Sequence, residues 1–565
     1  MKSENKVLNL LIQIFILILL IGFVYIFYKE QVLITGLIST LTVRQLPLYV
    51  LRSLLRMGIA YFFALVFSLV YGILAATNKR REAIMLPILD IFQSIPILGF
   101  FPAAIYFFIS TIPNKILGVE FASIFLIFTS QAWNMAFGVY ESISMIPRGI
   151  SEPYEFFDPQ GNLRFRRLYL PATIPKLIYN SIVSWTNGWY FLVASEIFAV
   201  GENAFRLPGI GSFIMEAATS GKVALTLLGI ITLSLVIIFM DLFIWRPLKH
   251  WSRRFMYSVS PGEEAETGVW DVVIVFWKAV GRLLNMFKRL FSRLKPERVK
   301  IRVSLNKIKN RRIGRVMRRV ILALIFIISV FLVVGFVRSV ENIVTNIQFS
   351  DILFSLRSLL PSILRIMVAY AISLLWTFPV AILLFNHPRL SNFITPVFQV
   401  FSSLPAISFF PLFIFLFLPL SNGLNIASII LLLTGMQWYL FFTIYGGLKS
   451  IPDDVLEVTE SVGLKGFVRL KKLLLPAALP SLMTGTITAI GGGWNALIVA
   501  EYINVNGKIY AVNGIGSLLN VALSEGNQPL FMIALLIMVI TVFAVNHFVY
   551  RPFYVKILER FRMEA

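Results

Sequence analysis

Few side chains in this 565-residue sequence could do chemistry, and the most conspicuous lie in apolar surroundings. Glu196 and Glu501 each stand near the end of a long apolar segment, and each is followed by the same four residues, GIGS, at 209–212 and 514–517. A carboxylate there is costly unless it has partners or serves a solute pathway. We favour the first reading, in which each glutamate accepts hydrogen bonds from the GIGS backbone. If it faces the pathway instead, the solute is neutral or cationic. The candidate turn or gate residues are Gly209, Gly211, Gly514 and Gly516.

Two arginines and two tryptophans are the other candidates for contact with a solute. Arg56 and Arg365 lie in the matching motifs SLLRMGIAY and SILRIMVAY. They either form a positive entrance for an anion or extend to the membrane interface, and we favour the second. Trp189 and Trp494 follow glycines inside apolar segments. They either line a passage or pack against a neighbouring helix, and packing is the commoner case.

Several kinds of chemistry have no residues to support them. The sequence has no cysteine and only three histidines, which are not clustered, so disulfides and thiolate metal sites are excluded and no metal site is expected. No G-x-x-x-x-G-K-[ST] motif is present, so the chain does not bind ATP by that route. We expect no catalytic residues, no metal and no bound cofactor.

The composition is that of a protein that crosses the membrane many times. Hydrophobic residues make up 58% of the chain, charged residues only 14%, and the mean hydropathy is +0.81. Apolar runs of about 20 residues recur, enough to cross roughly 30 Å of hydrocarbon as helices. The net charge of +23 is concentrated in a few loops, as the positive-inside rule predicts for cytoplasmic segments. We therefore predict an all-α polytopic membrane protein that does not bind nucleic acid.

The chain is an internal duplication. SIPILGFFPAAIYFF at 94–108 matches SLPAISFFPLFIFLF at 403–417, an offset of 309 residues. Further pairs, from Trp133 with Trp438 to the RP dipeptides at 246–247 and 551–552, keep an offset of 305. Two copies with six spans each would share one orientation and be related by a twofold axis along the membrane normal. The predicted spans are 7–28, 54–77, 86–109, 118–140, 173–200 and 223–245 in the first copy, and 319–341, 362–386, 393–417, 425–447, 477–503 and 528–550 in the second.

This pattern predicts three parts. Residues 1–248 form a first six-helix module, 249–316 a basic amphipathic cytoplasmic linker, and 317–565 a second six-helix module. Most lysines and arginines lie on one side if both termini are cytoplasmic. The doubled prolines in the third span of each copy predict that this span is bent.

A polar insert precedes the fifth span in each copy, at 152–171 and 457–476. In the second copy we predict a short helix over 452–462 that ends at Gly463 in a left-handed conformation. The chain from Leu464 would then run along the membrane surface to Pro476 in the first turn of the next span. Two short helices would make a rigid knob that could receive force from a soluble partner.

The second insert resembles the EAA loop of ABC-importer permeases, in which E-x-x-x-x-x-G is followed by an apolar-x-Leu-Pro ending. ESVGLKGFVRLKKLLLPAALP keeps this spacing through Glu457, Gly463 and Pro476, with Val458 and Thr459 in place of the two alanines. The first insert carries Glu152, Asp158 and Pro171 at the equivalent positions, so glycine is replaced by aspartate. With GGWNALIVAEY…GIGSLL and the duplication, the chain is similar to the duplicated permease component of ABC-type anion importers of the nitrate/sulfonate/taurine branch.

The resemblance implies a transport subunit and no enzyme. The two loops would couple to a dimer of ABC ATP-binding subunits, which would bind ATP and Mg²⁺, and an extracytoplasmic solute-binding protein would deliver a small solute. The expected solute is an anion such as nitrate, a sulfonate or bicarbonate. The expected location of the protein is the plasma membrane. The alternative is an ion-coupled secondary transporter with 6+6 parallel repeats, which would use Glu196 and Glu501 and would need no matched cytoplasmic loops.

Overall fold

The computed structural model describes residues 42–94, 96–147, 149–150, 152–153, 164–197, 207–255, 348–505 and 508–561. The predicted spans at 7–28 and 319–341 lie outside the described residues. So do Asp158 and all of the predicted linker beyond residue 255. The described chain is almost entirely helical, and its only strands form one hairpin.

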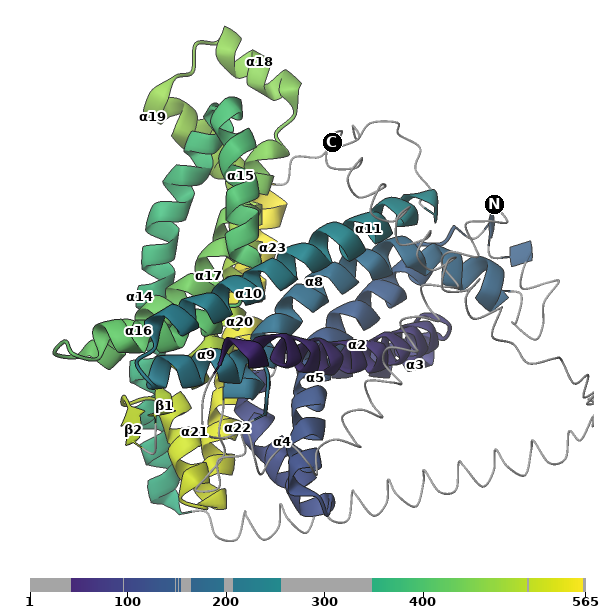
Figure 1. The fold of residues 1–565 in the computed structure, drawn as a ribbon. Helices are drawn as coiled ribbons and strands as arrows, with labels where there is room; N and C mark the ends of the chain where they lie inside the picture. The colour runs from purple at the N-terminus through teal and green to yellow at the C-terminus, as the bar shows by residue number, and fades with distance from the viewer. Residues whose placement is uncertain are drawn as a thin grey trace, which may run out of the picture.

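The first module is a series of helices (Figure 1). Its central helix α5 packs against both α2 and α8. The 3₁₀ turns Val43–Gln45 and Arg253–Phe255 flank the series. The helices are α2 (Leu46–Ala76), α3 (Lys79–Ser94), α4 (Ile97–Thr111), α5 (Lys115–Ser144), α8 (Leu170–Ile197), α9 (Ile210–Thr219), α10 (Val223–Met240) and α11 (Arg246–Ser252).

The second module repeats this order, with α17 packed against both α14 and α20. Its hairpin pairs β1 (Tyr502–Val505) with β2 (Lys508–Ala511) antiparallel, Tyr502 opposite Ala511. The helices are α14 (Phe349–Asn386), α15 (Pro388–Ser403), the 3₁₀ turn η5 (Ala406–Phe409), α16 (Phe410–Phe417), α17 (Gly423–Lys449), α18 (Asp453–Ser461), α19 (Gly466–Arg469), α20 (Leu475–Ala500), α21 (Ile515–Ser524), α22 (Gln528–Ala544) and α23 (Arg551–Phe561).

The duplication extends to local backbone geometry. A π-helical turn stands just before a proline at two places in each module, because proline lacks an N–H and its ring clashes with the carbonyl four residues earlier. The wider turn accommodates both effects and lets the helix continue. The four turns are η2 (Phe165–Tyr169) and η3 (Asp241–Trp245) in the first module, and η6 (Leu470–Leu474) and η7 (Val545–Tyr550) in the second.

The third predicted span is broken in both modules. In the second, α15 and the helical stretch from Ala406 to Phe417 are bent by 79° at a break before Pro405. In the first, α3 ends at Ser94 and α4 begins after Pro96. The predicted bend is therefore confirmed in the second module, and the first is interrupted at the equivalent place.

Seven helices of the described part are long and apolar enough to cross a membrane, or eight if the bent pair is one span. Of the other predicted spans, 86–109 is split between α3 and α4. The described part of 173–200 lies in α8, which ends at Ile197 and carries Asn180, Ser181 and Ser184 among its buried residues. The arrangement is that of an all-α polytopic membrane protein with tandem modules.

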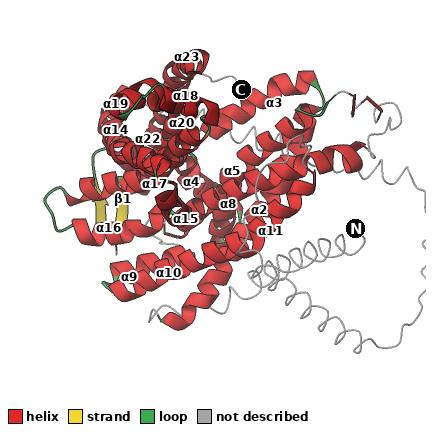
Figure 2. Ribbon diagram, turned by 90° about the horizontal axis from the view of Figure 1, so that it is seen from above, coloured by secondary structure: helices red, strands yellow, loops and turns green. Residues whose placement is uncertain are grey.

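The modules meet through a limited set of elements. α9 contacts α16, α4 contacts α20 and α21, α3 contacts α22, and α8 contacts η5. In Figure 1, α14, α17 and α20 run from top to bottom, whereas α2, α8 and α10 run across the picture. The end of the second module that carries α18 therefore lies far from the end of the first module that carries α11. The view from above in Figure 2 also separates α18 from α11.

Candidate functional site

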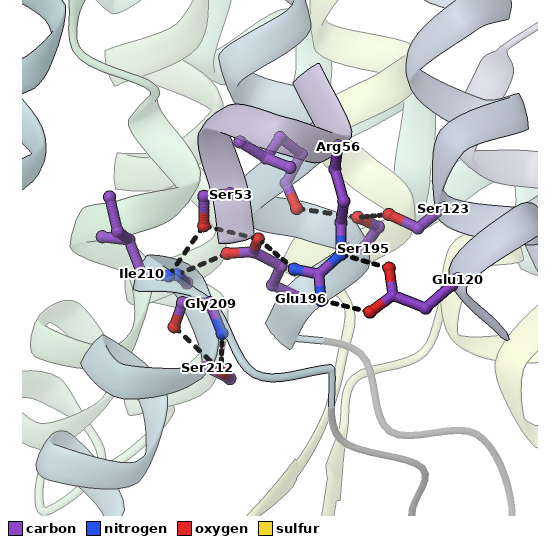
Figure 3. A network of polar contacts seen from close by, with 11 residues as sticks. Ser53, Arg56, Glu120, Ser123, Ser195, Glu196, Gly209, Ile210 and Ser212 are labelled. Atoms are coloured by element: carbon purple, nitrogen blue, oxygen red, sulfur yellow. Dashed lines mark hydrogen bonds and ion pairs between the residues drawn. The ribbon is translucent and has the colours of Figure 1, made fainter. Parts of the chain in front are cut away.

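Glu196, at the end of α8, is the centre of a buried polar network (Figure 3). Its Oε1 accepts hydrogen bonds from Ser53 Oγ at 2.6 Å and from Arg56 Nη1 at 2.7 Å. Its Oε2 accepts from the backbone N–H of Gly211 at 2.8 Å. The prediction that this carboxylate holds the GIGS turn is confirmed.

The network fixes the start of α9. The first N–H groups of a helix have no partner within the helix, and an anion there also interacts favourably with the helix dipole. Here Glu196 takes the N–H of Gly211, and Ser53 Oγ accepts from Ile210 N at 3.0 Å. Gly209 allows this approach, because a Cβ at that position would lie 2.2 Å from the carboxylate carbon of Glu196.

Arg56 lies inside the protein and does not reach the membrane interface. Its exposed fraction is 1%, and it joins two carboxylates. Its Nε and Nη2 donate to Glu120 at 2.5 and 2.6 Å, while Nη1 donates to Glu196. The predicted interfacial position is wrong, because Glu120 on α5 and Glu196 on α8 together compensate the buried guanidinium of Arg56, the eleventh residue of α2.

The second module repeats the network. Ser362 Oγ donates to Glu501 Oε1 at 2.7 Å and accepts from Ile515 N at 2.9 Å. Arg365 Nη1 donates to Glu501 Oε1 at 2.5 Å, and Gly516 N donates to Oε2 at 2.8 Å. Arg365 is 9% exposed, so its predicted interfacial position is also wrong.

One position distinguishes the two networks. The second contact of Arg365 is Asn425, whose Oδ1 accepts from Nε at 2.9 Å, where the first module has Glu120. The first network therefore holds two carboxylates and one guanidinium, and the second holds one of each. Gly514 plays the part of Gly209, because a Cβ there would lie 2.1 Å from Glu501 Oε2.

Sequence reasoning missed Ser53, Ser362, Glu120 and Asn425. A usable signal was present for the serines, since Ser-x-x-Arg occurs in both copies of the motif and places the two side chains on one helix face. Nothing comparable marked Glu120, which looks like an ordinary charge near the start of its helix.

Trp189 and Trp494 belong to the packed interior. Their exposed fractions are 1% and 4%, and both are part of the main hydrophobic core. Trp189 also meets Trp185 edge-on, with ring centroids 6.4 Å apart. They occupy the packed positions that we favoured.

The polar insert of the second module contains an exposed helix, α18. It begins after Pro452 with Asp453 and Asp454 in its first turn. It ends at Gly463, whose φ of +71° is the predicted left-handed conformation. The N–H of Leu464 donates to the carbonyl of Thr459 at 3.0 Å, which closes the helix end.

The remainder of the insert differs from the prediction. We expected a second helix along the membrane surface from Leu464, but α19, η6 and α20 form one continuous helical stretch from Gly466 to Ala500. The reason is that Leu473 and Leu474 are buried in the core, which draws this segment into the bundle. Pro476 lies in the first turn of α20.

Less can be described of the first insert. Glu152 lies in an exposed helical turn, and Pro171 is the second residue of α8 after the π turn. No group of three or more histidine, cysteine, aspartate or glutamate side chains that could hold a metal occurs among the described residues. The buried carboxylates are instead engaged in holding helices together.

Comparison with known proteins gives one family for both modules. Residues 68–245 and 373–555, more than half of the chain, each match the family described as "Binding-protein-dependent transport system inner membrane component". The chain is 25% identical over 207 residues to the bicarbonate transport system permease protein CmpB of Synechococcus elongatus, covering 36% of this chain and 69% of that protein.

Other relatives are named for other solutes. The chain is 28% identical over 143 residues to the taurine transport system permease protein TauC of Escherichia coli, covering 25% of this chain and 50% of TauC. It is 26% identical over 184 residues to the nitrate import permease protein NrtB of Leptolyngbya laminosa, covering 33% of this chain and 61% of NrtB.

Proposed function

Because the chain belongs to the family of binding-protein-dependent transport system inner membrane components, we propose that it supplies both permease modules of an ATP-driven importer in one polypeptide. Residues 1–248 and 317–565 are the proposed modules, joined by a linker at 249–316. The chain itself is a transport component. A dimer of separate ATP-binding subunits would bind ATP and Mg²⁺ and hydrolyse the nucleotide.

The observation that carries this proposal is the form of α18. Its Glu457, Val458 and Val462 are exposed, with Val462 at 70%, on a helix that projects from one end of the second module in Figure 1. Exposed apolar and acidic side chains on one short rigid helix suit a protein–protein contact. A simple connecting loop would need neither the helix nor its closed end.

The connection from α18 to the span favours transmission of force. After the turn at Gly463 and Leu464, the chain continues as one helical stretch that reaches Ala500, next to Glu501. A displacement of α18 would therefore move the whole fifth span and the network that holds α21. In Figure 1 the end of the second module that carries α18 lies apart from the end of the first module that carries α11. This separation is compatible with a rocking motion that brings the two ends together when the ATPase dimer closes.

The first insert is proposed to dock in the same way, through the region of Glu152 and Asp158. The replacement of glycine by aspartate makes this docking surface different from that of α18. The two ATP-binding subunits are therefore either different proteins or one protein that accepts two loops.

The solute is proposed to be a small anion such as nitrate, a sulfonate or bicarbonate, because the relatives are named for bicarbonate, taurine and nitrate transport. An extracytoplasmic solute-binding protein would deliver it. We propose the plasma membrane as the location, with both termini in the cytoplasm.

The ion-coupled alternative receives no support from the glutamates that it requires. Glu196 and Glu501 already accept hydrogen bonds at both carboxylate oxygens, from arginine, serine and backbone groups. A carboxylate that cycles a proton or a cation would have to give up these contacts in every turnover.

Affinity purification of the tagged chain from its native membrane tests the proposal. Wild type is expected to retain an ATP-binding subunit, identified by mass spectrometry. Glu457→Arg and Gly463→Pro are expected to lose it while remaining folded, and Glu525→Arg, an exposed acid after α21, is the matched control. Absence of any ATP-binding subunit from the wild-type preparation under gentle solubilisation would contradict the proposal.

A further inference from the structure

A polar seam joins the two modules, with α8 and the start of α4 on one side and α17 and α20 on the other. Tyr439 on α17 donates its hydroxyl to Asn187 Oδ1 on α8 at 3.3 Å. Tyr190, about one turn further along α8, packs against the main hydrophobic core, as Tyr439 does. Asn495 on α20 reaches the other module and accepts from Ile97 N at 2.7 Å. These contacts join segments that are hundreds of residues apart in the chain.

Most of the polar groups at the seam that remain available for a further hydrogen bond are donors. Asn187 Oδ1 is occupied by Tyr439, but its amide nitrogen has no partner among the described residues. The oxygen of Asn495 accepts from Ile97 and Leu98, and its amide nitrogen donates to the carbonyl of Gly491 at 3.1 Å. The hydroxyl of Tyr190 is buried and makes no hydrogen bond within the described part of the chain. A buried hydroxyl without a partner is costly, so it needs an explanation such as a ligand.

No unpaired buried charge accompanies these donors. Every buried charged side chain in the described ranges belongs to one of the two arginine–glutamate networks and is already paired. A solute at the seam would therefore meet neutral amide and phenol groups. Such a site suits a transporter, because a solute held without a counter-charge can be released again.

An exposed stretch of α20 lies beside Tyr439. A Cβ at Gly491, four residues before Asn495 on α20, would have no atom within 4 Å. Gly491 is exposed, although it lies on the face of α20 that carries Asn495 towards the first module. The next residue, Gly492, lies against Tyr439, because a Cβ there would be 3.2 Å from Tyr439 Cε2. This open surface of α20 therefore adjoins the seam.

We propose that Asn187, Tyr190 and Tyr439, with Asn495 and Gly491 beside them, form a solute site that binds a small oxyanion through neutral hydrogen-bond donors. This inference rests on the proposed function and adds the residues and chemistry of recognition. The oxyanion would accept from the Asn187 amide and the Tyr190 hydroxyl. The arginines of the two networks would take no part in binding.

The decisive variant is Tyr190→Phe, which removes a hydroxyl that has no protein partner. The fold should be unaffected or slightly stabilised, because a buried unsatisfied group is lost. If the hydroxyl binds the solute, KM for uptake should rise about fivefold to tenfold, the effect of one hydrogen bond. A purely structural residue would not combine unchanged stability with a raised KM.

Two further variants define the site. Asn187→Asp replaces a free donor with a negative charge and should raise KM for an anion on the order of a hundredfold. Tyr370→Phe is the control, since its hydroxyl bonds Thr486 within one module. Uptake of isotope-labelled nitrate, bicarbonate and taurine would be measured in vesicles that contain the complete transport system, with thermal stability measured in parallel.

The outcomes separate this inference from the proposed function. If wild type shows no ATP-dependent uptake of any of the three solutes, the proposed anion importer fails. If wild type transports one of them and Tyr190→Phe and Asn187→Asp keep wild-type KM, the seam site is overturned. A KM change in Tyr370→Phe as large as that in Tyr190→Phe would overturn it as well.

Because the native chain has no cysteine, accessibility gives a second test. Gly491→Cys should react with a charged, membrane-impermeant thiol reagent, and transported anion should slow the reaction. Leu375→Cys, which replaces a side chain that is 78% exposed on the apolar surface of α14, should stay unreactive in the membrane. An unreactive Gly491→Cys would contradict an aqueous site at the seam.

Discussion

The difference between the two arginine–glutamate networks predicts unequal effects of the same substitution. Glu501→Gln leaves the buried guanidinium of Arg365 with no carboxylate, since its other contact is the neutral Asn425. Glu196→Gln leaves Arg56 joined to Glu120 by two hydrogen bonds. The second module should therefore be damaged more than the first.

The magnitudes follow from the contacts. Removing one partner of a buried ion pair costs about 3–5 kcal/mol, because the remaining charge is uncompensated. Loss of one hydrogen bond between charged groups, with the arginine still paired, costs about 1.5–3 kcal/mol. Glu501→Gln should be the more destabilising by about 2 kcal/mol.

The assay is thermal unfolding of the purified chain in detergent, followed by intrinsic tryptophan fluorescence. The apparent Tm is expected to be highest for wild type, lower for Glu196→Gln and lowest for Glu501→Gln. In the double variant Glu501→Gln/Asn425→Glu, the new carboxylate stands where the first network has Glu120, so Arg365 is again paired, as Arg56 is in Glu196→Gln, and most of the lost stability should return. Equal losses in the two single variants, or no recovery in the double variant, would refute the reasoning.

Three further predictions concern glycines and the seam. Gly514→Ala should sharply lower the yield of folded protein, because its Cβ would lie 2.1 Å from a carboxylate oxygen, whereas Gly446→Ala, with no atom within 4 Å, should express as wild type. Gly463→Val should weaken co-purification of the ATP-binding subunit while Gly463→Asn keeps it, because asparagine adopts φ near +71° more readily than a β-branched residue. Asn495→Leu should lower the apparent Tm, because it leaves the N–H of Ile97 unpaired at a cost of about 1–3 kcal/mol. A wild-type Tm for Asn495→Leu would show that water replaces the asparagine.

The features that could be predicted depend on residues close together in the sequence or on the repeat itself. Glu196 and Gly211 are fifteen residues apart, so a carboxylate followed by a glycine turn indicated their contact. The left-handed Gly463 followed from local helix-end chemistry. The bend of the third span followed from its prolines.

The features that could not be predicted depend on long-range packing. Arg56 stands near the end of an apolar run, where arginines commonly extend to the interface. Its partners Glu120 and Glu196 are 64 and 140 residues away, and only the fold brings them together. One sequence gives no indication of such a distant pairing, so the favoured reading was wrong.

The predicted boundaries of the fifth span in the second module differ from the observed ones, also because of long-range packing. The positive charges between Leu464 and Pro476 suggested a segment on the membrane surface, but burial of Leu473 and Leu474 makes it part of the span helix. At the other end, the predicted span reached residue 503, whereas α20 ends at Ala500 and the hairpin begins at Tyr502. Tertiary burial decided both ends.

Uptake driven by ATP is the most direct test of the account. Vesicles would contain the chain, its ATP-binding subunits and the solute-binding protein. They should accumulate a labelled anion when ATP is present, even after ionophores have collapsed all ion gradients. Glu457→Arg in α18 should abolish this uptake without unfolding the chain. Uptake that follows an ion gradient without ATP, and that survives Glu457→Arg, would contradict the account and identify a secondary transporter.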